Sequence, residues 1–303
     1  AAHVTAAMTK PVGTGNDPTF VPAGDLVTYR FNVPDGALEI AARTDPGLVR
    51  GKNEDSVFAD ANQGLVILAD GMGGYNAGEI ASNMATKLLS ARLVAAFKAT
   101  AAYRTDSGSG LLFAHRCLKE QIAAVNLAIY QASERQSKFG GMGTTLVAAV
   151  FCDDQVVVAH IGDSRLYRLR GDQFMAMTHD HSVLQEQIDS GLISAAEARY
   201  SLQRNLVTRA VGIEAEVEAE IHVHPVRPGD VYLLCSDGLY DLVEEVEIHY
   251  TLEMHAVNLE RSAAKLIQMA NDNGGNDNIS VVVIKVLHAF PAAKRGWSKL
   301  WSW

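Results

Sequence analysis

Helix-like and strand-like hydrophobic patterns come in blocks along this 303-residue chain. Residues 77–98 and 111–134 place apolar side chains every three to four positions, which predicts two amphipathic helices. Apolar runs between turn residues predict strands at 37–44, 56–61, 65–69, 144–151, 155–161, 165–170, 231–235 and 279–286. A further helix is expected around 261–270. Because the elements do not alternate as βαβ units, the pattern favours an α+β fold with antiparallel sheets and helices outside them.

The distribution of proline separates the N-terminal region from the rest of the chain. Residues 1–36 hold four of its 8 prolines with glycines between them, a composition typical of loops, with one short strand expected at 26–31. We therefore expect an N-terminal extension over 1–36, one compact domain over 37–288, and a C-terminal tail over 289–303.

The charge balance excludes some classes of protein. Lys and Arg total 26 against 35 Asp and Glu, a net charge of −9, so the basic footprint of a nucleic-acid binder is missing. No signal peptide and no apolar stretch near the ~20 residues of a membrane span is found. Cys117, Cys152 and Cys235 are widely spaced, which predicts buried free thiols and a cytoplasmic location.

Four aspartates stand at the ends of predicted buried strands. Asp70, Asp163 and Asp237 directly follow apolar runs, and Asp277 precedes one. Each alone is explained as an ordinary turn residue. Together, at one rim of a core, they would repel each other in a low dielectric unless a cation neutralised them. Oxygen-only ligand sets suit magnesium and manganese, so the group favours a metal site.

Two glycine-rich segments, 71–74 and 140–145, lack the Gly-Lys-Ser/Thr of a nucleotide phosphate loop. After Asp70, glycine instead allows the backbone to approach a metal, so the Gly71 carbonyl is a candidate ligand.

In this order, the motifs resemble those of the bacterial type 2C metal-dependent serine/threonine protein phosphatases. The matching segments are 44–56, 70–74, 141–145, 162–165, 204–212, 236–239 and 276–280. The resemblance covers about 37–286 and implies a four-layer α-β-β-α sandwich, two packed antiparallel sheets flanked by helices. The metal cluster would lie at one edge, between the sheets.

The resemblance also implies two to three divalent metals, manganese or magnesium. Asp70 would bridge two of them and the Gly71 carbonyl would bind one. Asp237 and Asp277 would hold the other, and Asp163 with Asp237 would form a third-metal site.

For catalysis, the resemblance implies that a metal-bridging water attacks the phosphomonoester in line. Glu54 and Asp55 would act through metal-bound waters, and Arg50 would clamp the substrate phosphate. Taken alone, Arg50 is better explained as a surface salt bridge with a nearby acid, but its position four residues before Glu54 and Asp55 favours the clamp. Met72 replaces the histidine of many eukaryotic members, so the proton donor to the leaving group is open.

Several histidines have metal-like neighbours. The segment 179–181 (His-Asp-His) resembles a structural loop of the family, and His222 and His224 are expected to be solvated. A flap over about 178–202 is expected to shape substrate choice, and its residues 200–201 (Tyr-Ser) depart from the His-Pro of many relatives.

The sequence therefore predicts a phosphoserine/phosphothreonine protein phosphatase. It would act on phosphorylated proteins and reverse the phosphorylation made by a bacterial serine/threonine kinase. Two alternatives are a catalytically silent phosphoprotein-binding or scaffold module and a hydrolase of small phosphate esters. The complete acid set favours an enzyme over a silent module.

The C-terminal tail concentrates one residue type. It holds all 3 tryptophans among basic residues: Trp297, Trp301 and Trp303, with Lys294, Arg295 and Lys299. Such a segment suits a membrane interface or a docking groove on a partner. A tail that folds back on its own domain or makes no contact is the simpler expectation. A monomer is expected.

Overall fold

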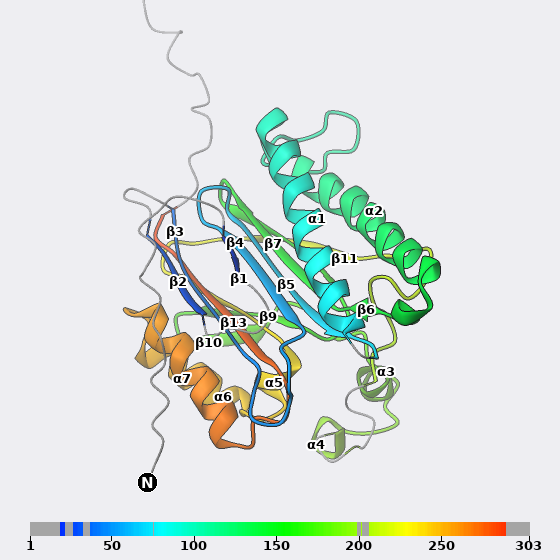
Figure 1. The fold of residues 1–303 in the computed structure, drawn as a ribbon. Coiled ribbons are helices and arrows are strands. Elements are labelled where there is room, and N and C mark those ends of the chain that lie inside the picture. Colours follow the sequence, from blue (N-terminus) through cyan, green and yellow to red (C-terminus); the bar gives the residue numbers. More distant parts are fainter. Residues whose placement is uncertain are drawn as a thin grey trace, which may run out of the picture.

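Two sheets lie face to face, with helices on the outer side of each (Figure 1). The computed structural model describes residues 19–21, 27–32, 37–74, 76–198, 201 and 206–288. Neighbouring strands pair in the antiparallel direction in both sheets. The predicted four-layer α-β-β-α sandwich is confirmed.

The first sheet has the order β1-β4-β5-β7-β8-β11, with β6 paired to β5. Its strands are β1 (Thr19–Val21), β4 (Asp55–Asp60), β5 (Leu65–Met72), β6 (Gly143–Thr144), β7 (Leu146–Cys152), β8 (Gln155–Ile161) and β11 (Glu220–Pro225). Successive side chains of a strand point to opposite faces. Leu65 and Ile67 of β5 therefore pack against α1 (Ala77–Ala99) and α2 (Phe113–Arg135), whereas Val66 packs against the other sheet.

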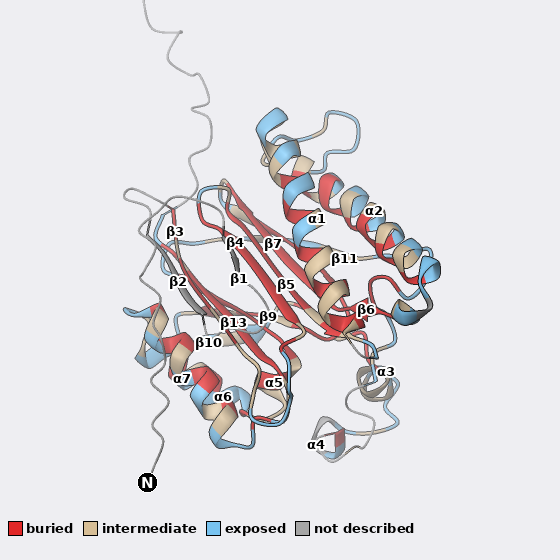
Figure 2. Ribbon diagram, viewed as in Figure 1, coloured by how far each residue is buried: buried red, intermediate tan, exposed pale blue. Residues whose placement is uncertain are grey.

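The second sheet has the order β10-β9-β12-β13-β3-β2. Its strands are β2 (Val27–Asn32), β3 (Leu38–Asp45), β9 (Arg165–Arg170), β10 (Gln173–Ala176), β12 (Val231–Cys235) and β13 (Ile279–Val286). Leu234 and Val282 face the first sheet, and Leu233 and Val283 face the helices. These helices are α5 (Asp237–Tyr240), α6 (Glu245–Met254) and α7 (Leu259–Asp272). Figure 2 shows the resulting buried centre of both sheets.

Short elements complete the chain. The 3-10 helix η1 (Ser137–Phe139) precedes β6, and α3 (Val183–Asp189) and α4 (Ala195–Ala198) lie within the predicted flap. Residues 199–200 and 202–205, which include the Tyr-Ser departure in part, lie outside the described residues.

The predicted elements agree with the structure within a few residues, and β12 and β13 have the predicted bounds. Helix α6 was not predicted, because its segment 245–252 alternates apolar and polar residues as a strand does. Strands β1 and β2 fall within the predicted extension, where they pair with β4 and β3. The domain boundary at residue 36 stays a prediction.

The three cysteines are buried free thiols, as predicted. Among the described residues, no helix has the length and apolarity that crossing a bilayer requires.

Candidate metal centre

Strand ends bring the predicted acids to one edge of the sandwich. Asp55 begins β4 and pairs directly with Asp70 of β5. Asp237 follows the end of β12, and Asp277 precedes β13, the antiparallel neighbour of β12. Asp163 lies in the turn between β8 and β9. Each sheet therefore contributes carboxylates to the same edge.

The acids are close enough to change each other's ionisation. Desolvation by burial is the main cause that raises the pKa of Asp70 well above its ordinary value, and the charges of Asp55 and Asp237 raise it further. The pKa of Asp237 is raised in the same way, first by desolvation and then by Asp163 and Asp277. Desolvation also raises the pKa of Asp55 to about 6 and that of Asp163 to about 7.

Two carboxylate oxygens in this cluster, Oδ1 of Asp55 and Oδ1 of Asp237, are buried and have no hydrogen-bond partner among the described residues. The other oxygen of Asp55, Oδ2, accepts a 2.8 Å hydrogen bond from the Ser236 hydroxyl. Buried polar atoms are normally satisfied, so unpartnered carboxylate oxygens among raised-pKa acids indicate a missing positive partner. Their all-oxygen chemistry fits a hard divalent cation such as manganese or magnesium.

Gly71 allows a close contact between β5 and α1. A Cβ at this position would lie 2.1 Å from the Gly78 carbonyl oxygen and 2.7 Å from that of Glu54. The Gly71 amide donates to the Glu54 carbonyl at 3.2 Å. Glycine is therefore required here by backbone packing, and Gly71 as a metal ligand stays a prediction. Desolvation raises the pKa of the Glu54 carboxyl.

Arg50 lies against the acid cluster. Its guanidinium forms a 2.7 Å ion pair with Asp277 Oδ2 and is half-exposed. The loop that carries it is anchored by Asn278, whose side-chain amide donates to the Pro46 and Lys52 carbonyls at 3.0 and 2.7 Å. The structure thus contains a salt bridge of Arg50 with a nearby acid, which was the alternative explanation from the sequence. The role of Arg50 as a phosphate clamp stays a prediction.

Two hydroxyl side chains that the sequence did not single out support the acids. The Ser236 hydroxyl accepts from the Ser280 amide at 3.0 Å while it donates to Asp55. Thr145 accepts from the Asp70 amide through its hydroxyl at 3.0 Å and donates its own amide to the Asp70 carbonyl at 2.8 Å. In the sequence, only their positions within the motifs point to these two residues. Their hydrogen bonds connect strands that are far apart along the chain, so no local pattern predicts them.

The turn that carries Asp163 is held from both sides. The Tyr240 hydroxyl donates to the Asp163 carbonyl at 2.9 Å. Nδ1 of His181 accepts from the Gly162 amide at 3.3 Å, and the His181 amide donates to the Gly162 carbonyl at 3.0 Å. These bonds fix the backbone from which the Asp163 carboxylate projects.

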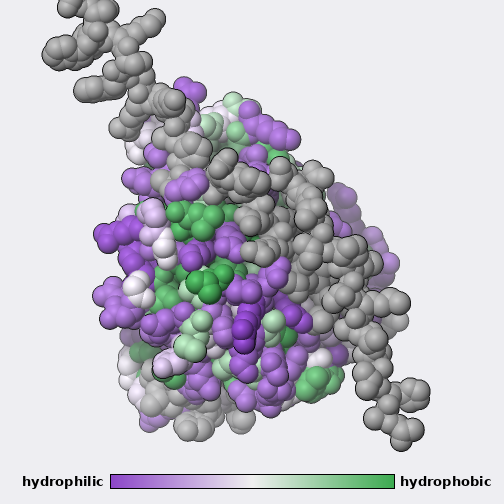
Figure 3. Space-filling view, turned by 90° about the vertical axis from the view of Figure 1, so that its left-hand side faces the viewer, coloured by the Kyte–Doolittle hydropathy of each residue, from purple (hydrophilic) through white to green (hydrophobic). Residues whose placement is uncertain are grey.

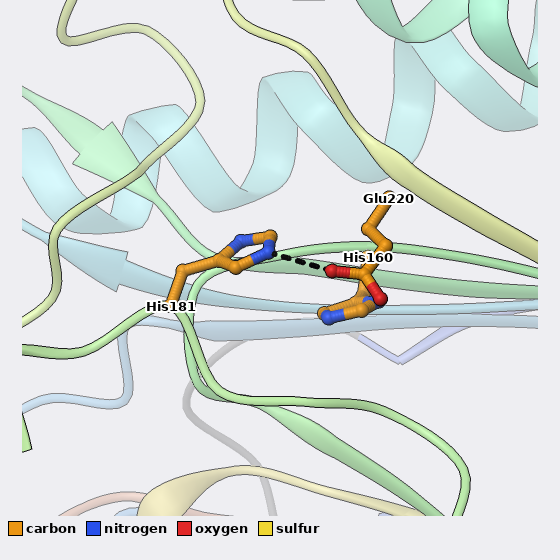
Figure 4. A group of neighbouring side chains, drawn as sticks. All are labelled: His160, His181 and Glu220. Carbon is orange, nitrogen blue, oxygen red and sulfur yellow. Dashed lines mark hydrogen bonds and ion pairs between the residues drawn. The ribbon is translucent and has the colours of Figure 1, made fainter. Parts of the chain in front are cut away.

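A second group of metal-type side chains, His160, His181 and Glu220, lies next to this turn. Figure 4 shows these three side chains. The two imidazole rings stack with centroids 4.8 Å apart and planes 17° apart. Nε2 of His160 shares a 2.8 Å hydrogen bond with the His179 carbonyl, and Nε2 of His181 lies 3.3 Å from Glu220. Because ring lone pairs lie in the ring planes, nearly parallel rings do not converge on one ion. The contacts support the structural interpretation of 179–181.

Comparison with known proteins agrees with this geometry. The family model described as protein phosphatase 2C matches residues 50–281. The serine/threonine phosphatase stp of Listeria welshimeri is 41% identical over 246 residues, which cover 80% of this chain and 94% of that relative.

Solved structures give the same result. The crystal structure of the Mycobacterium tuberculosis serine/threonine phosphatase PstP/Ppp matches with a TM-score of 0.73 at 39% identity, covering 83% of this chain and 99% of that one. The catalytic domain of PstP in complex with 2 manganese ions matches with a TM-score of 0.70 at 40% identity, covering 82% and 98%.

The chain belongs to the protein phosphatase 2C family. Within that family it is a bacterial-type, metal-dependent serine/threonine protein phosphatase.

Proposed function

We propose that the acid cluster holds two to three divalent cations, manganese or magnesium, for hydrolysis of phosphoserine and phosphothreonine in proteins. Asp70 and the Gly71 carbonyl are the proposed ligands on the first sheet, and Asp237 and Asp277 those on the second. Asp163 with Asp237 is the proposed third site. The observation that carries this assignment is the pair of buried, unpartnered carboxylate oxygens on Asp55 and Asp237.

The chain's own residues then have separate tasks. Bound divalent cations supply a water of lowered pKa and neutralise charge on the phosphoryl oxygens. Glu54 and Asp55 orient that water through hydrogen bonds. Arg50, on the open side of the cluster, turns from Asp277 to the substrate phosphate, for which its planar guanidinium is suited. Met72 has no transferable proton, so the leaving group takes its proton from water or from another residue.

The proposed substrates are phosphorylated proteins, and the proposed physiological role is to reverse a bacterial serine/threonine kinase. The named activity of the Listeria and Mycobacterium relatives supports this role. Three buried free cysteines support a reducing, cytoplasmic setting. We propose that the chain acts as a monomer.

Phosphate release from a phosphothreonine peptide tests the proposal, with manganese, with chelator, and with the variant Asp237→Asn. We expect turnover with manganese to fall by at least about a hundredfold in chelator and in the variant, since both remove the electrostatic stabilisation. Asp272→Asn, the same change at an exposed acid on α7, is the control and should keep full activity.

Two outcomes would contradict the proposal. A folded, manganese-loaded chain without turnover would favour the phosphoprotein-binding module. Faster turnover of a small aryl phosphate than of any phosphopeptide, by kcat/KM, would favour the hydrolase of small esters.

A further inference from the structure

Helix α6 exposes an apolar stripe on the side away from the core. Val246, Tyr250 and Met254 are spaced by four residues, which places them on one face of the helix. Their exposed fractions are 67%, 64% and 65%, and Val257 in the following turn is 87% exposed. Contiguous exposed apolar side chains of this kind mark an interaction surface. Figure 3 shows apolar patches interrupting the hydrophilic surface on this side of the molecule.

The segment of chain that carries this stripe is acidic. Residues 242–260 contain no Lys or Arg and five glutamates: Glu244, Glu245, Glu247, Glu253 and Glu260. A partner for this surface should therefore combine large apolar side chains with positive charge.

An open pocket of about 480 Å³ lies at the first turn of α6. Phe174 and His249 line it and stack with ring centroids 5.5 Å apart and planes 12° apart. Asp172 adds an acidic group, whereas Glu245 already pairs with Arg165 at 3.7 Å. Val246 joins the pocket to the α6 stripe. Phe174 also stacks on Tyr167 with ring centroids 4.9 Å apart, so the pocket offers an indole ring aromatic edges for edge-to-face packing, with Asp172 nearby for a cation.

The chain leaves the domain beside the other end of this stripe. The Lys285 ammonium donates to the Ala256 carbonyl at 2.9 Å, in the turn between α6 and α7. The described residues end three positions later, at His288. At roughly 3.3 Å per extended residue, Trp297 can reach about 30 Å from His288. Helix α6, with ten residues, is about 15 Å long. The whole stripe is therefore within reach.

We propose that the tail, residues 289–303, binds in the same chain to the α6 stripe and the adjoining pocket. The tail supplies the chemistry that this surface lacks: three tryptophans, three basic residues and no acid. Its attachment next to the surface gives it a high effective concentration there, which favours this contact over a separate partner. An anionic membrane is a poorer match, because the acidic surface beside the attachment point would be repelled.

Tryptophan fluorescence tests this directly, because every tryptophan of the chain is in the tail. We expect the emission maximum of the full-length chain to lie at a shorter wavelength than that of a free peptide of residues 289–303. We also expect acrylamide to quench the full-length chain less. Tyr250→Glu and Met254→Glu should each lower the docked-to-free ratio about tenfold, as loss of one apolar contact does. Leu127→Glu on α2, also a partly exposed apolar site, is the matched control and should leave the emission unchanged.

A second variant avoids any change in the domain. Lys294→Glu combined with Lys299→Glu lies outside the described domain and should shift the emission toward that of the peptide. The proposal is overturned if wild-type emission equals that of the peptide, or if none of these variants moves it. A blue shift that vanishes on dilution would mean that the tail binds a second copy of the chain. A blue shift that appears only with phosphatidylserine vesicles would mean that the tail binds membranes.

Discussion

Strand β12 has an aspartate at each end, in opposite electrostatic environments. Asp230, before the strand, is 1% exposed and receives hydrogen bonds from Arg170 at 2.7 and 2.6 Å. The Arg227 amide donates to it as well, at 2.8 Å. Asp237, after the strand, has a buried oxygen with no partner in the described part of the chain. Desolvation raises its pKa, and the charges of Asp163 and Asp277 raise it further.

The difference separates an acid held by an ion pair from an acid that we propose as a metal ligand. At Asp230 the protein itself supplies the positive charge, so the ion pair stabilises the end of the strand. At Asp237 the neighbouring charges are of the same sign, so the carboxylate is neutralised by a proton or, in the proposed function, by a bound cation. Position at a strand end alone therefore does not mark a metal ligand.

Exchanging each acid for its amide should give opposite effects on stability. Asp230→Asn should lower the free energy of unfolding by about 3 kcal/mol, because it leaves Arg170 mostly buried without its counter-charge. Asp237→Asn should raise it in chelator, because it removes one of several repelling charges. Urea unfolding in chelator measures both. Equal destabilisation by the two variants would refute the comparison.

The pH dependence of stability sharpens the comparison. The folded-state pKa values of Asp55, about 6, and Asp163, about 7, lie above the ordinary value of 3.8. Folding therefore favours their protonated forms, and stability in chelator is present near pH 4 and is lost as the pH rises to about 7. A pKa shift of one unit changes the free energy of unfolding by at most about 1.4 kcal/mol when the groups titrate together.

Thermal unfolding between pH 5 and 8 tests this, with and without manganese. Manganese binds the deprotonated carboxylates, so it should stabilise more strongly at pH 8 than at pH 5. A melting temperature in chelator that rises over this range would contradict the assignment.

Loss of a supporting hydroxyl should have the smallest effect. Ser236→Ala removes the hydrogen bond to Asp55 and should cost about 1 kcal/mol of stability. It should also weaken manganese binding about tenfold, because Asp55 is no longer oriented. Ser133→Ala is a matched control, since this buried hydroxyl bonds to Phe139, on the α2 side of the molecule. A metal affinity that falls equally in both variants would rule out a specific role for Ser236.

Much of this architecture could be predicted from local sequence. Strand ends placed Asp70, Asp237 and Asp277 at one rim, because apolar runs define buried strands. The direct pairing of Asp55 with Asp70 depends on the register between β4 and β5, which hydrophobicity does not specify residue by residue.

Other features depend on contacts between distant segments. Ser236 meets Asp55 across 181 residues of sequence, and Arg50 meets Asp277 across 227. Helix α6 alternates like a strand, yet Ile248 and Leu252, spaced by four, pack into the core beneath it. Tertiary packing decided its conformation against the local pattern.

The pairing of β3 with β13 sets an order of events during synthesis. Thr44 and Ser280, joined by a 2.8 Å hydrogen bond, are 236 residues apart. The hairpins β4–β5 and β7–β8 form from neighbouring segments, whereas the centre of the second sheet requires the last strand. Asp277 precedes that strand, so a nascent chain emerging from the ribosome presents Asp55 and Asp70 long before their counterparts. The proposed metal site, and the activity that depends on it, is therefore complete only when nearly the whole domain has been translated.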